Sequence, residues 1–218
     1  MIPLQFALRR RMMMAGGGGA PISELPLGAL INVGTDGGAG TPNYEIADTD
    51  NFVSGGVVLV RKNIYSKSQF GSTAYYSGST LDNLITNTIY NNMPQELRNE
   101  MMDVPFMYNY PTTVTRKMST LTRTMASGNT NDIVKGNALQ LYTSNASRIK
   151  TFDGSAASWW LATTYDAERA YYVDRGGSIV YTYGWNTSTM GVAPAFAIPS
   201  ETLYDATPNT DGSYNLIL

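Results

Sequence analysis

The chain has 218 residues and a formal net charge of −2, with 43% hydrophobic, 11% aromatic and 15% charged residues. This length favours one domain with a sizeable core, and the small net charge gives no general attraction to nucleic acid or membranes. Cysteine and histidine are both absent, which excludes disulfides, zinc sites built on thiolate or imidazole, and Cys–His or Ser–His–Asp catalysis. We expect no cofactor and no metal.

Residues 1–22 are predicted to form an anchoring arm. An amphipathic helix with arginines beside its apolar face precedes a glycine tether at residues 16–19. The residues expected to anchor the arm are Phe6, Leu8, Arg9, Arg10 and Arg11. A frayed terminus is the alternative.

The arginines follow the apolar residues, the reverse of a secretory signal, and no apolar run approaches the ~20 residues of a membrane span. We therefore expect synthesis in the cytoplasm, no membrane partner and no nucleic-acid partner.

The first half of the chain contains three predicted strands, within residues 23–33, 44–46 and 56–61. The run at 56–61 is continuously apolar, which favours a strand buried on both faces. The glycines at 37–40 are interpreted as a loop, because no Gly-Lys-Ser/Thr and no helical pattern follow them.

Two helices are predicted next. The apolar spacing of residues 79–89 indicates a helix with Ser79 as its N-cap, and a second short helix is expected to begin at Pro94. Glu96 and Glu100 share a face of this second helix, so an acid/base pair is geometrically feasible, but a solvated face is the favoured interpretation. Residues 106–135 are polar and rich in threonine, and we expect irregular structure there.

The final third alternates between polar and apolar residues. The segments 170–173 and 178–183, separated by Gly176 and Gly177, predict a hairpin. A last strand is expected at 192–198. The stretches 153–164 and 191–199 are expected to lie side by side in one sheet. Residues 205–218 are predicted to be a tail whose last residues return to the sheet or to a neighbouring subunit.

Trp159, Trp160 and Leu161 are followed later in the chain by Gly191-Val-Ala-Pro-Ala195. With these motifs, the order of features within residues 23–204 resembles a domain family of unknown function that is common in phages and prophages of Gram-positive bacteria. The usual signature of that family is Trp-Trp-Leu-Arg-Ser-Pro followed by Gly-Val-Arg-Pro-Ala. This chain has Ala162 and Ala193 in place of the two arginines, which places any function that depends on them in doubt.

The resemblance implies an α+β fold similar to the C-type lectin domain, with two helices flanking small twisted antiparallel sheets and long irregular loops. It also implies a role in the virion, as a tail-tip, fibre or head-decoration component. Calcium-dependent sugar binding is not expected, because the Glu-Pro-Asn, Gln-Pro-Asp and Trp-Asn-Asp triplets that support it are absent.

Exposed tyrosine and tryptophan side chains are the candidate ligand contacts, because they bring a large contact area at low entropic cost. The candidates are Tyr165, Tyr171, Tyr172, Tyr181, Tyr183 and Trp185. About half of them should point inward on alternating strands. Trp159, Trp160 and Pro194 are predicted to belong to the core, with a ligand contact as the alternative for one tryptophan.

These observations lead to two hypotheses of different classes. The first is a non-enzymatic virion protein, displayed on a phage head or tail and bound to other virion proteins, forming a homo-oligomer and contacting a host-surface glycan or protein. The alternative is a glycan-active enzyme that uses carboxylates such as Asp166, Glu168 and Asp174. A third reading is that the long loops carry deliberately varied ligand contacts.

Overall fold

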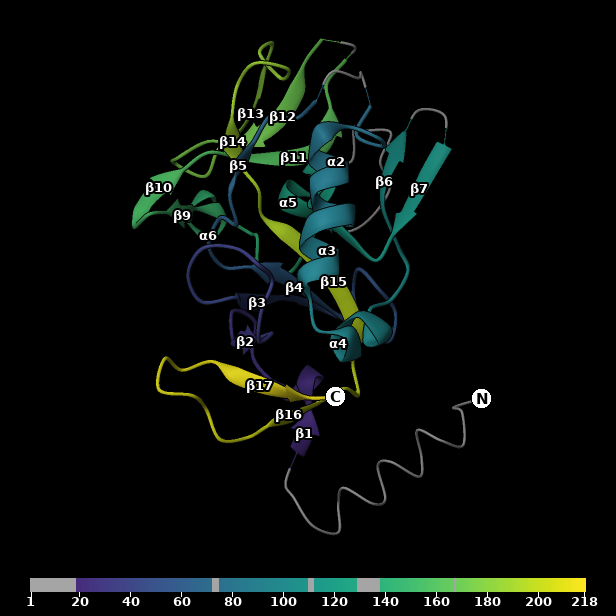
Figure 1. The fold of residues 1–218 in the computed structure, drawn as a ribbon, viewed down its shortest axis with the longest axis vertical. Coiled ribbons are helices and arrows are strands. Elements are labelled where there is room, and N and C mark those ends of the chain that lie inside the picture. The colour runs from purple at the N-terminus through teal and green to yellow at the C-terminus, as the bar shows by residue number, and fades with distance from the viewer. Residues whose placement is uncertain (1–18, 72–74, 110–111, 129–137, 167) are drawn as a thin grey trace.

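The largest element of the fold is an eight-stranded mixed sheet. The computed structural model describes residues 19–71, 75–109, 112–128, 138–166 and 168–218. In spatial order the strands of the large sheet are β1 (Gly19–Pro21), β16 (Leu203–Asp205), β17 (Tyr214–Ile217), β2 (Leu30–Asn32), β3 (Asn43–Thr49), β4 (Gly56–Arg61), β15 (Pro194–Pro199) and β8 (Met118–Thr120). This sheet runs through the lower and central parts of the molecule in Figure 1.

The centre of the core lies at β4, between β3 and β15. All residues of β4 are buried, as are those of β15 up to Ile198. The prediction of a strand buried on both faces is confirmed, because the continuous apolar run leaves neither face suited to water. The expected strand at 44–46 lies inside β3, whereas only Leu30–Asn32 of the expected entry strand pairs as β2.

A second sheet of five strands forms the upper part of the molecule (Figure 1). Its strands, in spatial order, are β13 (Ile179–Thr182), β12 (Ala170–Val173), β11 (Trp159–Thr164), β14 (Met190–Gly191) and β5 (Lys67–Ser68). The predicted hairpin is confirmed as β12 and β13, and Gly177 supplies the positive φ of +83° in its turn. Trp159 pairs with Gly191, but β15 belongs to the other sheet. The two signature stretches are therefore adjacent only where Trp159 meets Gly191, and the prediction of one shared sheet is wrong for residues 194–199.

The predicted helices are present. A continuous helical segment comprises α2 (Thr80–Asn83), a π-helical turn (Leu84–Ile89) and α3 (Tyr90–Asn92), and the Ser79 hydroxyl caps it by accepting the Asp82 N–H. The second predicted helix is α4 (Gln95–Glu100). Shorter helical segments are the 3-10 turn Ile22–Glu24, α5 (Arg123–Ser127) and α6 (Asn145–Arg148).

The expectation of irregular structure at 106–135 is wrong over most of the part that the structure describes. The strands β6 (Val104–Asn109) and β7 (Thr112–Arg116) form a hairpin, β8 pairs with β15, and α5 follows. Threonine is polar, which favoured the prediction of irregular structure, but it is also β-branched and has a high preference for strands. Residues 129–137 lie outside the described part.

The expected α+β, C-type-lectin-like fold is also wrong. Strands hold 36% of the residues and helices 17%, so the protein is mostly β. The sheets are not small antiparallel units, because the largest has eight strands and both it and the five-stranded sheet contain a parallel pair, β17 with β2 and β11 with β14. A two-stranded sheet of β9 (Lys150–Phe152) and β10 (Ser155–Ala157) completes the strands.

The two ends of the described chain meet in the large sheet. Within the expected arm, Gly19–Pro21 pairs with β16 and Ile22 is fully buried. Within the expected tail, β17 pairs with β16 and with β2, so the final residues return to the sheet of this chain. The predicted anchoring residues Phe6 to Arg11 lie outside the described residues.

Candidate functional site

Four tyrosines come together where β11 and β13 end, and these strands belong to the sheet in the upper part of the molecule (Figure 1). This tyrosine cluster consists of Tyr165, Tyr171, Tyr181 and Tyr183. The rings of Tyr165 and Tyr181 are stacked with centroids 4.5 Å apart, and Tyr171 meets both edge-on. Tyr165, Tyr181 and Tyr183 are 47%, 45% and 64% exposed, whereas Tyr171 is only 6% exposed. The cluster is therefore a surface feature built over one buried ring.

Strand alternation explains which candidates join the cluster. Tyr171 and Tyr172 are neighbours on β12, so their side chains point to opposite faces of the sheet. Tyr171 lies opposite Tyr181 in the register of β12 and β13. Tyr172 instead meets the edge of Trp160, with centroids 6.1 Å apart, and Trp185 is buried against Phe70. Four of the six predicted ligand contacts thus come together, and Tyr172 and Trp185 lie apart from them.

Arg169 joins the exposed rings to one another. Its guanidinium carbon lies 4.0 Å from the ring centroid of Tyr165, 5.0 Å from that of Tyr181 and 4.9 Å from that of Tyr183. Its Nη1 also donates a hydrogen bond of 3.2 Å to the Tyr183 hydroxyl. Such contacts between a cation and aromatic faces are attractive, so Arg169 fixes the relative positions of the rings.

The charge of Arg169 is balanced by Asp166. Nε donates to Oδ2 over 2.6 Å, and Nη2 bonds the same oxygen. These hydrogen bonds raise the pKa of Arg169 and lower the pKa of Asp166. The pair is open to water, so it contributes little to stability. The effect of the ion pair is local, because the carboxylate of Asp166 neutralises the positive charge that Arg169 brings to the cluster.

A second arginine supports the buried ring from below. Nη1 of Arg123, on α5, donates 2.8 Å to the Tyr171 hydroxyl, and the guanidinium lies 4.4 Å from the same ring centroid. Sequence reasoning missed both arginines. Arg169 lies only four residues after Tyr165 in the sequence, which is a weak indication that the two side chains are close. Arg123 is distant in sequence from the tyrosines, so nothing local indicated its contact with Tyr171.

The predicted core residues lie in the interior. Trp159 and Trp160 are both fully buried, and their indole N–H groups donate to the carbonyl oxygens of Arg148 and Ser68 over 3.0 Å and 2.8 Å. Pro194 is also buried and pairs with Thr120. These side chains pack the fold and are not available to a ligand.

The two alanines that replace the signature arginines lie near the same segment. Ala162 donates its N–H to the carbonyl oxygen of Leu121, and Ala193 precedes Pro194, which pairs with Thr120. Both alanines are buried. No charge is present at either position in this chain.

The carboxylates of the enzyme hypothesis have structural partners. Asp174 accepts the N–H groups of Gly176 and Ser178 and so shapes the β12–β13 turn. Asp166 is paired with Arg169, and Glu168 is exposed. Glu96 and Glu100 lie on α4. Among the described residues no group of three or more Asp and Glu residues could hold a metal ion. No described helix is long and apolar enough to cross a membrane.

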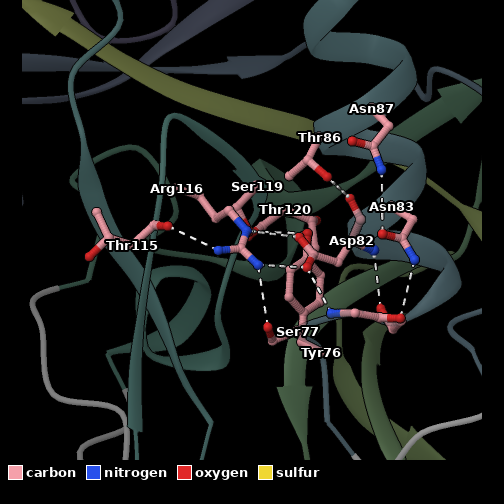
Figure 2. A network of polar contacts seen from close by, with 12 residues as sticks. Tyr76, Ser77, Asp82, Asn83, Thr86, Asn87, Thr115, Arg116, Ser119 and Thr120 are labelled. Atoms are coloured by element: carbon pink, nitrogen blue, oxygen red, sulfur yellow. Dashed lines mark hydrogen bonds and ion pairs between the residues drawn. The ribbon is translucent and has the colours of Figure 1, made fainter.

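A polar network ties the helical segment to the β6–β7 hairpin (Figure 2). Arg116 on β7 contacts both carboxylate oxygens of Asp82 on α2, over 3.1 Å and 2.8 Å, and Asp82 also accepts the Gly78 N–H. Arg116 further donates to the Ser77 hydroxyl and the Thr115 carbonyl. The carboxylate is fully engaged by these donors, so this network holds the hairpin in place and is not a reactive centre.

A buried ionic network joins β9 to β3. The Lys150 ammonium donates to Glu45 Oε1 over 2.9 Å and to the Arg61 carbonyl over 2.6 Å, while Tyr142 donates to the same Oε1. Lys62 binds the other oxygen of Glu45. Burial alone would raise the pKa of Glu45, but the two lysines outweigh it and lower the pKa. Glu45 is therefore a fixed anion and not a proton donor.

These features define a mostly β domain with an exposed tyrosine cluster at one end of its long axis. A family model described as a domain of unknown function, DUF6273, matches residues 54–200. The chain therefore belongs to this family, in agreement with the expected membership of a domain family of unknown function. The match begins later than the resemblance at residues 23–204. Comparison with curated proteins and with solved structures gives no match.

Proposed function

We propose that this chain is a non-enzymatic structural protein of a bacteriophage particle, anchored by residues 1–22 and presenting the tyrosine cluster to the host surface. It would be a head or tail decoration or a fibre component, assembled as a homo-oligomer on other virion proteins. Attachment to the host would require neither a cofactor nor a metal.

The observation that carries this proposal is the separation of the two ends. The first described strand, β1, lies at the lower end of the long axis, whereas β12 and β13, which carry Tyr171 and Tyr181 of the cluster, lie at the upper end (Figure 1). An arm that continues from β1 toward a particle would leave the cluster on the side facing away from it. Exposed tyrosine is also the residue type that binding surfaces use to gain contact area at low entropic cost.

The choice of a bacteriophage particle rests on the resemblance of the sequence motifs to a domain family of phages and prophages. Of the carboxylates that the competing enzyme hypothesis names, Asp174 shapes a turn, Asp166 is paired with Arg169 and Glu168 is exposed.

The test is the location of the protein on particles induced from the source strain. Particles purified on a density gradient are labelled with gold-coupled antibody raised against residues 20–218, and particles from a strain lacking the gene serve as the control. Label on the head or tail supports the proposal, and the position distinguishes head decoration from a tail or fibre role. Gradient-purified particles without label or immunoblot signal would refute the virion role.

A second variant tests the arm. Removing residues 1–18 spares β1, whose pairing with β16 begins at Gly19. We expect this chain to fold with an unchanged melting temperature and to be lost from particles. Incorporation equal to that of the full chain would refute the anchoring role of the arm while leaving the virion role intact.

A further inference from the structure

We infer that the tyrosine cluster binds a neutral glycan, with the rings of Tyr181 and Tyr183 stacking against the apolar faces of neighbouring sugar rings. The inference rests on the proposed function, because it names the chemistry of the attachment face. Tyr181 lies on β13 and Tyr183 at the bend that follows it, and both rings contact the guanidinium of Arg169. Two exposed rings held beside one guanidinium suit neighbouring units of an oligosaccharide.

The size of the exposed aromatic surface favours a sugar over a protein partner. An aromatic side chain buries about 150–250 Å² when fully covered, so the exposed parts of Tyr165, Tyr181 and Tyr183 amount to about 300 Å². This aromatic area is sufficient for a few sugar rings, whereas a protein partner would also need several hundred Å² of the surrounding surface to reach the roughly 800 Å² that a stable interface buries on each side.

The charge of the cluster favours a neutral ligand. Arg169 is bound to Asp166, and Arg123 is bound to the hydroxyl and ring of Tyr171. Glu168 adds an exposed carboxylate nearby in sequence. A phosphate- or carboxylate-bearing glycan would have to break the Asp166–Arg169 pair to gain a cation and would meet two carboxylates. A neutral sugar requires neither change, because it needs only ring faces and hydroxyl partners.

The rings are already ordered before a ligand arrives. Tyr165 and Tyr181 stack on one another, and the Tyr183 hydroxyl is held by Arg169. Binding to rings that are fixed in advance loses little side-chain entropy. The ring of Tyr183 nevertheless keeps most of its surface exposed, so its contact with Arg169 leaves area for a ligand.

The experiment titrates the full chain with four tetrasaccharides by calorimetry and by saturation-transfer NMR. The neutral probes are cellotetraose, maltotetraose and tetra-N-acetylchitotetraose, and the anionic probe is tetragalacturonate. We expect at least one neutral probe to bind with saturation transfer to its ring protons, and tetragalacturonate to bind more weakly. Tyr183→Ala should weaken the neutral probe about tenfold, as loss of one stacking contact implies.

Two variants serve as controls. Tyr183→Phe keeps the ring and loses only the hydroxyl, so its affinity should stay close to that of the natural chain. Leu27→Ala removes an exposed apolar side chain that belongs to the lower part of the molecule, before β2, and should change nothing. Tyr183 is mostly exposed, so an unchanged melting curve for Tyr183→Ala shows that lost affinity is not lost folding.

Three outcomes would overturn the inference. They are no binding of any neutral probe at about 10 mM, tighter binding of tetragalacturonate, and neutral binding that survives both Tyr181→Ala and Tyr183→Ala. Crosslinking of the cluster to another virion protein without sugar binding would replace the glycan with a protein partner. The assay uses isolated protein, so sugar binding and particle labelling can fail separately.

Discussion

Replacing Asp36 with alanine should destabilise the protein more than any surface substitution, because it leaves a buried arginine without its counter-ion. The side chains of Arg61 and Asp36 are 0% and 1% exposed, and Nε lies 2.5 Å from Oδ2. Asp36 belongs to the glycine-rich loop between β2 and β3, and Arg61 ends β4. The pair therefore fastens this loop to the central strand of the large sheet.

The expected loss of stability depends on which contacts the guanidinium of Arg61 retains. Without Asp36 it still donates to the carbonyl oxygens of Asn63 and Ala39, each over 3.0 Å, but no opposite charge remains beside it. Removing one partner of a buried pair costs about 3–5 kcal/mol. The Tyr44 hydroxyl also loses its acceptor, a penalty that overlaps with the first and is not added to it. A loss of about 4 kcal/mol is a large share of the ~5–15 kcal/mol that holds a domain folded.

Urea unfolding followed by tryptophan fluorescence measures this loss as a lower midpoint at unchanged slope. Asp166→Ala removes the same kind of carboxylate from a partly exposed arginine, in a pair whose side chains are 18% and 37% exposed, and should leave the midpoint unchanged. The double variant Asp36→Leu with Arg61→Met removes both charges and should be more stable than Asp36→Ala alone. A loss below about 1 kcal/mol for Asp36→Ala, or a double variant less stable than the single one, would refute the reasoning.

Three further predictions concern packing, pH and backbone strain. Trp160→Ala should cost about 3–5 kcal/mol in the free energy of unfolding, measured in urea, since it empties a fully buried position; an unchanged midpoint would place the indole outside the core. Burial raises the pKa of three tyrosine hydroxyls above that of an unfolded chain, so their stability contribution is complete below pH ~10 and is lost as the pH rises further. These residues are Tyr44, Tyr76 and Tyr142. Tyrosinate absorbance should therefore include a step that coincides with loss of circular dichroism, and full titration in the folded state would contradict this. Gly177→Ala should lower the melting temperature strongly, because the φ of Gly177 is +83° and the new Cβ would lie 1.8 Å from the Asn145 carbonyl oxygen. Gly154→Ala is the matched control, since Gly154 has a similar φ of +75° but nothing near its Cβ, and it should lower the melting temperature less.

The elements that sequence alone predicted are those with a strong local pattern. β4 is a continuous apolar run, α2 has a serine cap and apolar residues at helical spacing, and the β12–β13 hairpin has its glycine turn. Each of these signals acts within a few residues, so no knowledge of distant contacts was needed.

The elements that it did not predict depend on distant partners. β7 is rich in threonine and β8 is only three residues long, and their strand character becomes evident only when β7 pairs with β6 and β8 pairs with β15. The parallel pairing of β17 with β2 joins Tyr214 to Ile31 across nearly the whole chain. Local periodicity contains no information on such pairings, which is why the fold class was mistaken while many of its elements were correct.

The candidate site shows the same division. The tyrosines were identified by residue type, but the separation of Tyr172 from Tyr171 and Tyr181 required the register of β12 against β13. Arg169 and Arg123 became part of the site only through contacts in space.

The same pair of side chains, arginine and aspartate, serves two different purposes in this protein, and burial decides which. Between β2 and β4 the pair is sealed from water, so each charge depends on the other and the pair fixes the loop. Beside the tyrosine cluster the pair is open to water, so it contributes little to folding and instead cancels a charge among the rings. Substitutions at the cluster should therefore leave the domain folded, so the proposed glycan binding can be tested separately from stability.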